Sequence, residues 1–222
     1  MTRTLSGVLW DMDGTLLDSE KLWDIGVYEL AEHLGGTMTQ ELRHSLIGSS
    51  GANALLSMFA ALDLEPAAHA IADAGHWLEA RVTELFKAGI PWRPGAKDAL
   101  AMVRDAGLPM GLVTNTKRSL TEYGLDALGR EHFDVSICAD EVDHGKPRPD
   151  LYLRGAELLG LAPAQCLAIE DSPTGALSAE AAGCSVLVVP CEIPVPDGPG
   201  RVFRETLLGV TLTDLHEAWN RV

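Results

Sequence analysis

Short apolar runs of strand length recur along the chain and alternate with longer stretches of helical spacing. The apolar runs occupy residues 5–10, 109–113, 135–138, 166–169 and 186–189. The helix-like stretches between most of them occupy residues 95–106, 117–128, 149–159 and 174–182. This alternation predicts an α/β fold, a Rossmann-like parallel sheet with helices on both faces. Such sheets bind ligands at the carboxyl ends of their strands, so reactive side chains are expected directly after each apolar run.

One interval, residues 17–88, breaks the alternation because it contains no strand-like run. Its apolar residues follow helical spacing instead, at Leu22, Ile25, Tyr28, Leu30, Leu34, Leu55, Leu56, Met58, Phe59, Leu62, Trp77, Leu78, Val82, Leu85 and Phe86. That spacing predicts several amphipathic helices. We therefore expect residues 1–16 and 89–222 to form the Rossmann-like core and residues 17–88 to form an inserted α-helical cap domain. The Pro- and Gly-rich segment 190–200 is expected to be a surface loop.

The first apolar run ends in two carboxylates, Asp11 and Asp13, with Gly14 directly after them. A straight strand would place both on one face, but a glycine lets the chain turn, so each acid can take a different role. One aspartate can attack phosphorus while its neighbour protonates the leaving oxygen and later activates water. An Asx-type turn is the structural alternative. A calcium loop is excluded because further acids at the required offsets are missing.

Two further segments offer groups that bind phosphate. Thr114 and Asn115 follow the second apolar run, where a hydroxyl and an amide can donate to a phosphate or simply cap the next helix. Lys146 stands between a glycine and Pro147. It can neutralise both a phosphate and a carboxylate, or it can be a solvated loop lysine.

The fourth apolar run is followed by two adjacent acids, Glu170 and Asp171. Together with Asp11 and the backbone carbonyl of Asp13, they offer hard oxygen ligands for an octahedral Mg²⁺. Adjacent acids repel each other unless a cation lies near them. The alternative is that Asp171 or Ser172 caps the following helix. Taken together, the four segments supply a complete set of groups for phosphoryl transfer.

Charge and cysteine usage narrow the setting. The 32 acidic and 17 basic residues give a formal charge of -15, which repels nucleic acid and anionic membrane surfaces. No segment has the apolar length of a membrane span, and the first residues do not resemble a signal peptide. The four cysteines lack the paired spacing of zinc sites, which favours buried thiols in a reducing compartment. We expect a cytoplasmic monomer or weak homodimer with no nucleic-acid or membrane partner.

In its four motifs the sequence resembles the haloacid dehalogenase-like hydrolase superfamily, over essentially the whole chain. The resemblance implies a Rossmann-like core whose helical cap closes over the substrate. It also implies residue roles. Asp11 would be the nucleophile and a metal ligand, and Asp13 the general acid/base that binds the metal through its carbonyl. Thr114 and Asn115 would hold the phosphoryl group, Lys146 would stabilise charge, and Glu170 and Asp171 would position Mg²⁺.

Departures within the superfamily indicate the substrate. Dehalogenases and phosphonate hydrolases lack the second aspartate, so Asp13 favours phosphate esters. Members of the β-phosphoglucomutase type carry a cap histidine where this chain has Trp23. The sequence therefore predicts a phosphatase of small phosphorylated metabolites, sugar or polyol phosphates, that works through an aspartyl-phosphate. The alternatives are a sugar phosphomutase and a non-catalytic binding module.

A loop within the expected cap is a candidate for substrate contact. Gly48 permits close backbone approach, and Ser49 and Ser50 can bind sugar hydroxyls, although a plain turn between helices with a serine N-cap explains the same residues. Residues 51–53 contain no arginine of the kind found there in the mutases. This argues against a second phosphate in the substrate.

Overall fold

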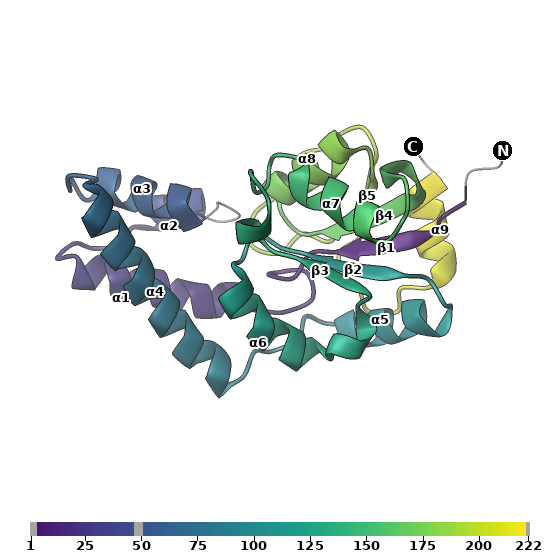
Figure 1. The fold of residues 1–222 in the computed structure, drawn as a ribbon, viewed down its shortest axis with the longest axis horizontal. Coiled ribbons are helices and arrows are strands. Elements are labelled where there is room, and N and C mark those ends of the chain that lie inside the picture. Colours follow the sequence, from purple (N-terminus) through teal and green to yellow (C-terminus); the bar gives the residue numbers. More distant parts are fainter. Residues whose placement is uncertain (1–3, 47–50, 221–222) are drawn as a thin grey trace.

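The computed structural model describes residues 4–46 and 51–220 and contains one parallel sheet in that part of the chain (Figure 1). Its strands are β1 (Gly7–Trp10), β2 (Met110–Val113), β3 (Val135–Ile137), β4 (Cys166–Glu170), β5 (Ser185–Val188) and β6 (Arg201–Phe203). They lie in the order β3-β2-β1-β4-β5-β6, and every neighbouring pair is parallel. The predicted α/β class and all five predicted strands are confirmed, whereas β6 was not predicted.

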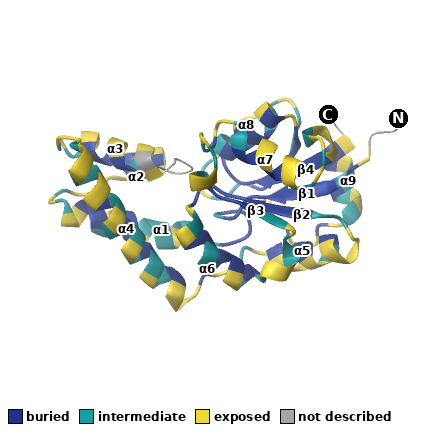
Figure 2. Ribbon diagram, viewed as in Figure 1, coloured by how far each residue is buried: buried dark blue, intermediate teal, exposed yellow. Residues whose placement is uncertain are grey.

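Helices cover both faces of this sheet. They are α5 (Ala96–Asp105), α6 (Arg118–Leu128), α7 (Asp150–Leu158), α8 (Pro173–Ala182) and α9 (Leu212–Asn220). Short 3-10 turns form η1 (Arg130–His132), η2 (Ala139–Glu141) and η3 (Pro163–Gln165). Successive residues of a strand point to opposite faces, so Val8 and Trp10 join the core that contains α5, α6 and α9, while Leu9 joins the core under α7 and α8. Strands β1, β2, β4 and β5 are therefore buried on both faces (Figure 2).

Four helices lie between β1 and α5, and in Figure 1 they extend away from the sheet. They are α1 (Glu20–His33), α2 (Gln40–Leu46), α3 (Gly51–Ala61) and α4 (Ala68–Ala88). Helix α4 packs against α1, α3 and α6, with Leu78, Val82 and Phe86 on its buried face. The division of the chain into a core and a cap stays a prediction.

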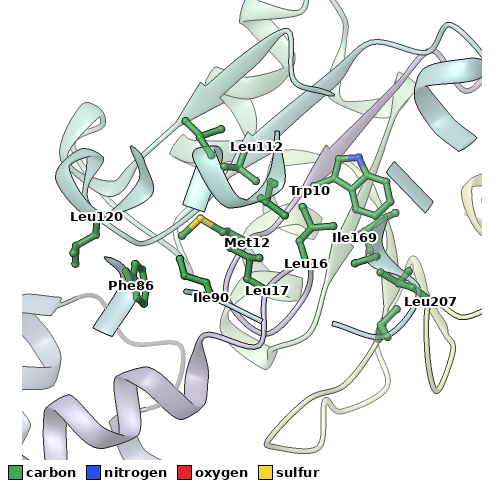
Figure 3. Close-up of a cluster of buried hydrophobic side chains, with 14 of the residues drawn as sticks. Trp10, Met12, Leu16, Leu17, Phe86, Ile90, Leu112, Leu120, Ile169 and Leu207 are labelled. Atoms are coloured by element: carbon green, nitrogen blue, oxygen red, sulfur yellow. The ribbon is translucent and has the colours of Figure 1, made fainter. Parts of the chain in front are cut away.

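The loop after β1 is anchored by its apolar residues (Figure 3). Met12, Leu16 and Leu17 have no exposed surface and pack in the same cluster as Phe86 at the end of α4. Full burial of such a side chain is worth about 1.5–3 kcal/mol. Asp11 and Asp13 flank Met12 in the sequence, so the packing of this one side chain holds both carboxylates at the sheet edge.

Cys138, Cys166 and Cys184 are buried free thiols, as predicted, and Cys191 is partly exposed. Among the described residues, no helix combines the length and hydrophobicity needed to cross a membrane.

Candidate active site

Asp11 and Lys146 form the centre of the site. Asp11 directly follows β1, and its backbone N–H donates to the carbonyl of Ile169 at the end of β4. The Lys146 Nζ donates to Asp11 Oδ1 at 2.6 Å, to Glu170 Oε1 at 2.6 Å and to the carbonyl of Val113 at 3.0 Å. The side chains of Asp11, Lys146 and Glu170 are 8%, 4% and 0% exposed. Lys146 is therefore a buried cation between two carboxylates.

Glu170 is held from several sides. Its Oε1 also accepts a hydrogen bond from the Tyr152 hydroxyl at 2.6 Å, and its Oε2 accepts weaker ones from the backbone N–H of Asp171 and the hydroxyl of Ser172. In α8, Gly175 lies so close that a Cβ there would overlap the Glu170 carboxylate. Ser172 caps α8 by accepting from the Gly175 N–H at 3.1 Å. Glu170 is thus fixed in place before any ligand binds.

Asp13 accepts four hydrogen bonds from two directions. The hydroxyls of Thr114 and Thr116, which follow β2, donate to Oδ2 at 3.1 and 2.8 Å. Near α1, the Ser19 hydroxyl donates to Oδ1 at 2.6 Å and the Trp23 indole N–H at 3.3 Å. These four donors, from two separate parts of the chain, fix the position and orientation of the Asp13 carboxylate.

Asn115 ties the Lys146 loop to the end of β2. Its Oδ1 accepts from the Lys146 backbone N–H at 2.8 Å and its Nδ2 donates to the Lys146 carbonyl at 3.2 Å. A Cβ at Gly145 would lie 2.6 Å from Asn115 Oδ1, so the glycine permits this close approach. The amide predicted to contact substrate therefore also positions the lysine.

Three carboxylates gather where a metal was predicted. Oxygens of Asp11, Glu170 and Asp171 lie within 4.8 Å of one another. Asp11 Oδ2 is buried and has no hydrogen-bond partner among the described residues. At Gly14, where φ is 83°, a Cβ would overlap the Asp171 carboxylate, so the turn after Asp13 leaves room for Asp171. An unpaired buried oxygen beside further acids fits a hard divalent cation.

Burial dominates the acid–base behaviour of this cluster. Burial, together with the charge of Glu170, raises the pKa of Asp11 to about 8 against the opposing effect of Lys146. Burial, with the charges of Asp11 and Glu170, also raises the pKa of Asp171 well above its ordinary value. Burial alone would lower the pKa of Lys146, but the same two acids raise it above its ordinary value. The lysine alone does not offset the acids, so an added cation would favour their ionised forms.

A cavity of about 530 Å³ opens over these groups. Asp11, Asp13, Lys146 and Asp171 line one side. Residues of α1 to α4 line the other, among them Glu20, Trp23, Arg43, Leu55, Ile71, His76 and Glu79. Burial, together with the charge of Asp13, raises the pKa of Glu20 to about 7 against the opposing effect of Arg43. The cavity therefore lies between the carboxylates and lysine at the sheet edge and the side chains of helices α1 to α4.

The structure brings together Asp11, Asp13, Thr114, Asn115, Lys146, Glu170 and Asp171, while Gly48, Ser49 and Ser50 lie outside the described residues. Sequence reasoning missed Thr116, Tyr152 and Arg43. Thr116 stands beside a recognised motif, which was a usable signal, whereas Tyr152 looks like any core aromatic. Residues 51–53 lack the arginine that mutases carry there, but Arg43 of α2 lines the cavity described above.

Comparison with known proteins finds a hydrolase family and several similar phosphatases. A family model of haloacid dehalogenase-like hydrolases matches residues 5–183. Hexitol phosphatase A of Escherichia coli (strain K12) is 34% identical over 86% of this chain and 85% of its own. A phosphorylated carbohydrates phosphatase of Thermotoga maritima is 31% identical over 81% and 82%.

Solved structures agree with the fold. CbbY from Rhodobacter sphaeroides, crystallised with phosphate, is 27% identical over 96% of this chain and 99% of its own, with a TM-score of 0.82. A mutant of that protein was crystallised with xylulose-(1,5)bisphosphate and has a TM-score of 0.83. The match to the family model spans most of the chain and includes every acid of the site. This chain belongs to the haloacid dehalogenase-like hydrolases.

Proposed function

We propose that this protein is a Mg²⁺-dependent phosphatase of small phosphorylated metabolites, with sugar or polyol phosphates as its substrates. The observation that carries the proposal is the pairing of two differently held carboxylates. Asp11 is fixed by Lys146 through one oxygen and keeps the other unbonded, while Asp13 lies beside it among hydroxyl donors. Relatives named for hexitol and carbohydrate phosphates support the substrate class.

In the proposed reaction, a carboxylate oxygen of Asp11 attacks phosphorus and the bond to the leaving oxygen breaks. Asp13 gives its proton to that leaving oxygen. Water then attacks the aspartyl-phosphate, its proton passes to Asp13, and inorganic phosphate leaves with Asp11 restored. Lys146 offsets the charge of Asp11, and Thr114 and Asn115 border the space for the phosphoryl group.

Asp11, the carbonyl of Asp13 and Asp171 would hold Mg²⁺ directly. When bound, the ion would neutralise phosphoryl charge and orient the group for in-line attack. Glu170 would support the metal site without coordinating the ion, because its Oε1 already accepts from Lys146 and Tyr152 and its side chain does not line the cavity. Of the four residues predicted to bind the metal, Glu170 would therefore act indirectly.

Trp23 favours phosphatase over mutase. Its indole N–H donates to Asp13, and its ring packs edge-on against Phe86 with centroids 6.2 Å apart. An indole donates a hydrogen bond but does not exchange a proton near neutral pH as an imidazole does. The intact set of acids also argues against a non-catalytic binding module.

The test is a phosphate-release assay over a panel of sugar, polyol and nucleoside monophosphates, with Mg²⁺ or with EDTA. We expect Mg²⁺-dependent turnover that falls at least about a thousandfold in Asp11→Asn, the range for loss of a covalent nucleophile. Asp13→Asn should accumulate phosphorylated enzyme, and Asp105→Asn, on the exposed end of α5, serves as the control. Full activity of Asp11→Asn would refute the covalent mechanism, and exchange of phosphate positions without release would indicate a mutase.

A further inference from the structure

A buried charge cluster lies on the side of the cavity away from the sheet. Arg43 of α2 donates from Nη2 to Glu20 Oε2 at 2.9 Å and from Nε to Asp24 Oδ1. The Arg43 and Glu20 side chains are only 8% and 13% exposed. Glu20 and Arg43 line the cavity, whereas Asp24 lies behind them and is partly exposed. We call these three residues the Glu20 cluster.

The Glu20 cluster lies beside the reacting groups. Ser19, which precedes Glu20, donates its hydroxyl to Asp13, and the charge of Asp13 acts on Glu20. Because Asp13 would protonate the leaving oxygen, Glu20 lies where the carbon skeleton of the leaving group would pass. Its position is therefore suited to contact the substrate next to the bond that breaks.

One oxygen of Glu20 remains available. Oε2 accepts from Arg43, whereas no residue within 4–46 and 51–220 donates to Oε1, which is not sealed from solvent. A carboxylate offers about four acceptor positions, so an oxygen that opens into the cavity can accept from a ligand. A hydroxyl of a bound substrate would supply that donor.

The charge of the Glu20 cluster argues against a substrate with a second phosphate. Two carboxylates face one guanidinium, so the net charge is negative when Glu20 is ionised and zero when it is protonated. A second phosphate needs an unpaired cation, and Arg43 already spends its Nε and Nη2 on acids. The carboxylates of the Glu20 cluster would repel a second phosphate strongly, so the cluster selects against substrates that carry two phosphates.

We infer that Glu20, held by Arg43, accepts hydrogen bonds from hydroxyls of the leaving group, and that the Glu20 cluster restricts substrates to monophosphates of neutral polyols or sugars. This inference rests on the proposed phosphatase activity.

The first experiment compares kcat/KM for sorbitol 6-phosphate with kcat/KM for 4-nitrophenyl phosphate, whose leaving group has no hydroxyl chain. In Glu20→Ala this ratio should fall about tenfold or more, the usual effect of losing a hydrogen bond to a charged acceptor. Glu32→Ala, on the exposed side of the same helix, should keep the wild-type ratio. An equal loss on both substrates would show that Glu20 is only structural and would overturn the inference.

The second experiment uses fructose 1,6-bisphosphate and needs no variant for its main result. The wild type should hydrolyse it with a lower kcat/KM than fructose 6-phosphate, and the double variant Glu20→Gln with Asp24→Asn, which leaves Arg43 charged and unpaired, should narrow that gap. Preference of the wild type for the bisphosphate would overturn the inference. Absence of Mg²⁺-dependent turnover on every phosphate, 4-nitrophenyl phosphate included, would instead contradict the proposed function.

Discussion

At the scale of single residues, the site depends on groups whose charges are balanced by contact. Lys146 touches Asp11 and Glu170 at once, and Asn115 holds its backbone from both sides. Removing one partner from a buried ion pair costs about 3–5 kcal/mol, because the remaining charge stays buried and uncompensated. The same contacts that orient Asp11, the proposed nucleophile, therefore also stabilise the end of β1.

Glu20 should make stability depend on pH. Its pKa is about 7 in the folded protein and 4.5 ordinarily, so the folded state holds the proton more tightly than the unfolded chain. The free energy of unfolding should therefore fall as pH rises from about 4.5 to 7 and level off above. Glu20→Gln removes this titration. Between pH 5 and pH 8, the free energy of unfolding of the variant should therefore rise by about 1–3 kcal/mol relative to that of the wild type.

Urea unfolding across that pH range, without Mg²⁺ or substrate, checks this prediction. Glu32→Gln is the matched control, because it removes an exposed carboxylate from the same helix. Parallel curves of unfolding free energy against pH for wild type and Glu20→Gln would contradict it.

The acids of the site were predictable because they directly follow apolar runs, and sequence shows both features. Thr116 could have been found beside Thr114 and Asn115, but Tyr152 and Arg43 could not, since their roles depend on which distant residue they meet. Tyr152 reaches Glu170 across 18 positions, and Arg43 meets Glu20 across 23. Local spacing carries no information about such contacts.

At the scale of elements, α8 is built around the carboxylate it supports. Gly175 lies in its first turn, where alanine would ordinarily favour the helix by about 0.5–1 kcal/mol relative to glycine. Here the added methyl would overlap Glu170. Gly175→Ala should therefore destabilise the protein and lower kcat, because Glu170 and with it Lys146 must move.

Thermal unfolding and steady-state kinetics of Gly175→Ala check this expectation. Gly51→Ala is the control for thermal unfolding, since a Cβ at Gly51, also in the first turn of its helix, meets no atom of residues 4–46 and 51–220 within 4 Å. A Gly175→Ala protein as stable and as active as wild type would show that Glu170 has room to shift.

The elements were predicted to different degrees for physical reasons. Strands β1, β2, β4 and β5 are mostly apolar and buried throughout because helices cover both faces of the sheet. Strand β6 has three residues, none of them buried, and so lacks that signal. Helix α2 spans seven mostly polar residues, and its burial of Leu42, Arg43 and Leu46 is decided by its neighbours.

At the scale of the whole molecule, acids from distant parts of the chain, Asp11 after β1 and Glu170 and Asp171 at the end of β4, meet at one edge of the sheet. We expect Mg²⁺ to raise the midpoint of thermal unfolding, because an ion that binds only the folded state adds about 2.7 kcal/mol at a hundred times its dissociation constant. Asp171→Asn should lose most of this increase, and Asp105→Asn should keep it. Differential scanning calorimetry with and without EDTA measures the shift, and an unchanged midpoint in wild type would contradict a specific metal site.

The cavity draws its walls from two separate parts of the chain. The groups proposed to act on phosphorus follow strands, whereas Glu20, Arg43 and Glu79 come from the helices between β1 and α5. In the proposed function, the residues for catalysis and the residues that select the substrate are thus encoded in different segments of the gene. Mutations in one segment can change the substrate preference while the other segment keeps the phosphate-cleaving groups intact. A lineage with this architecture can therefore evolve towards a new substrate without rebuilding its catalytic residues.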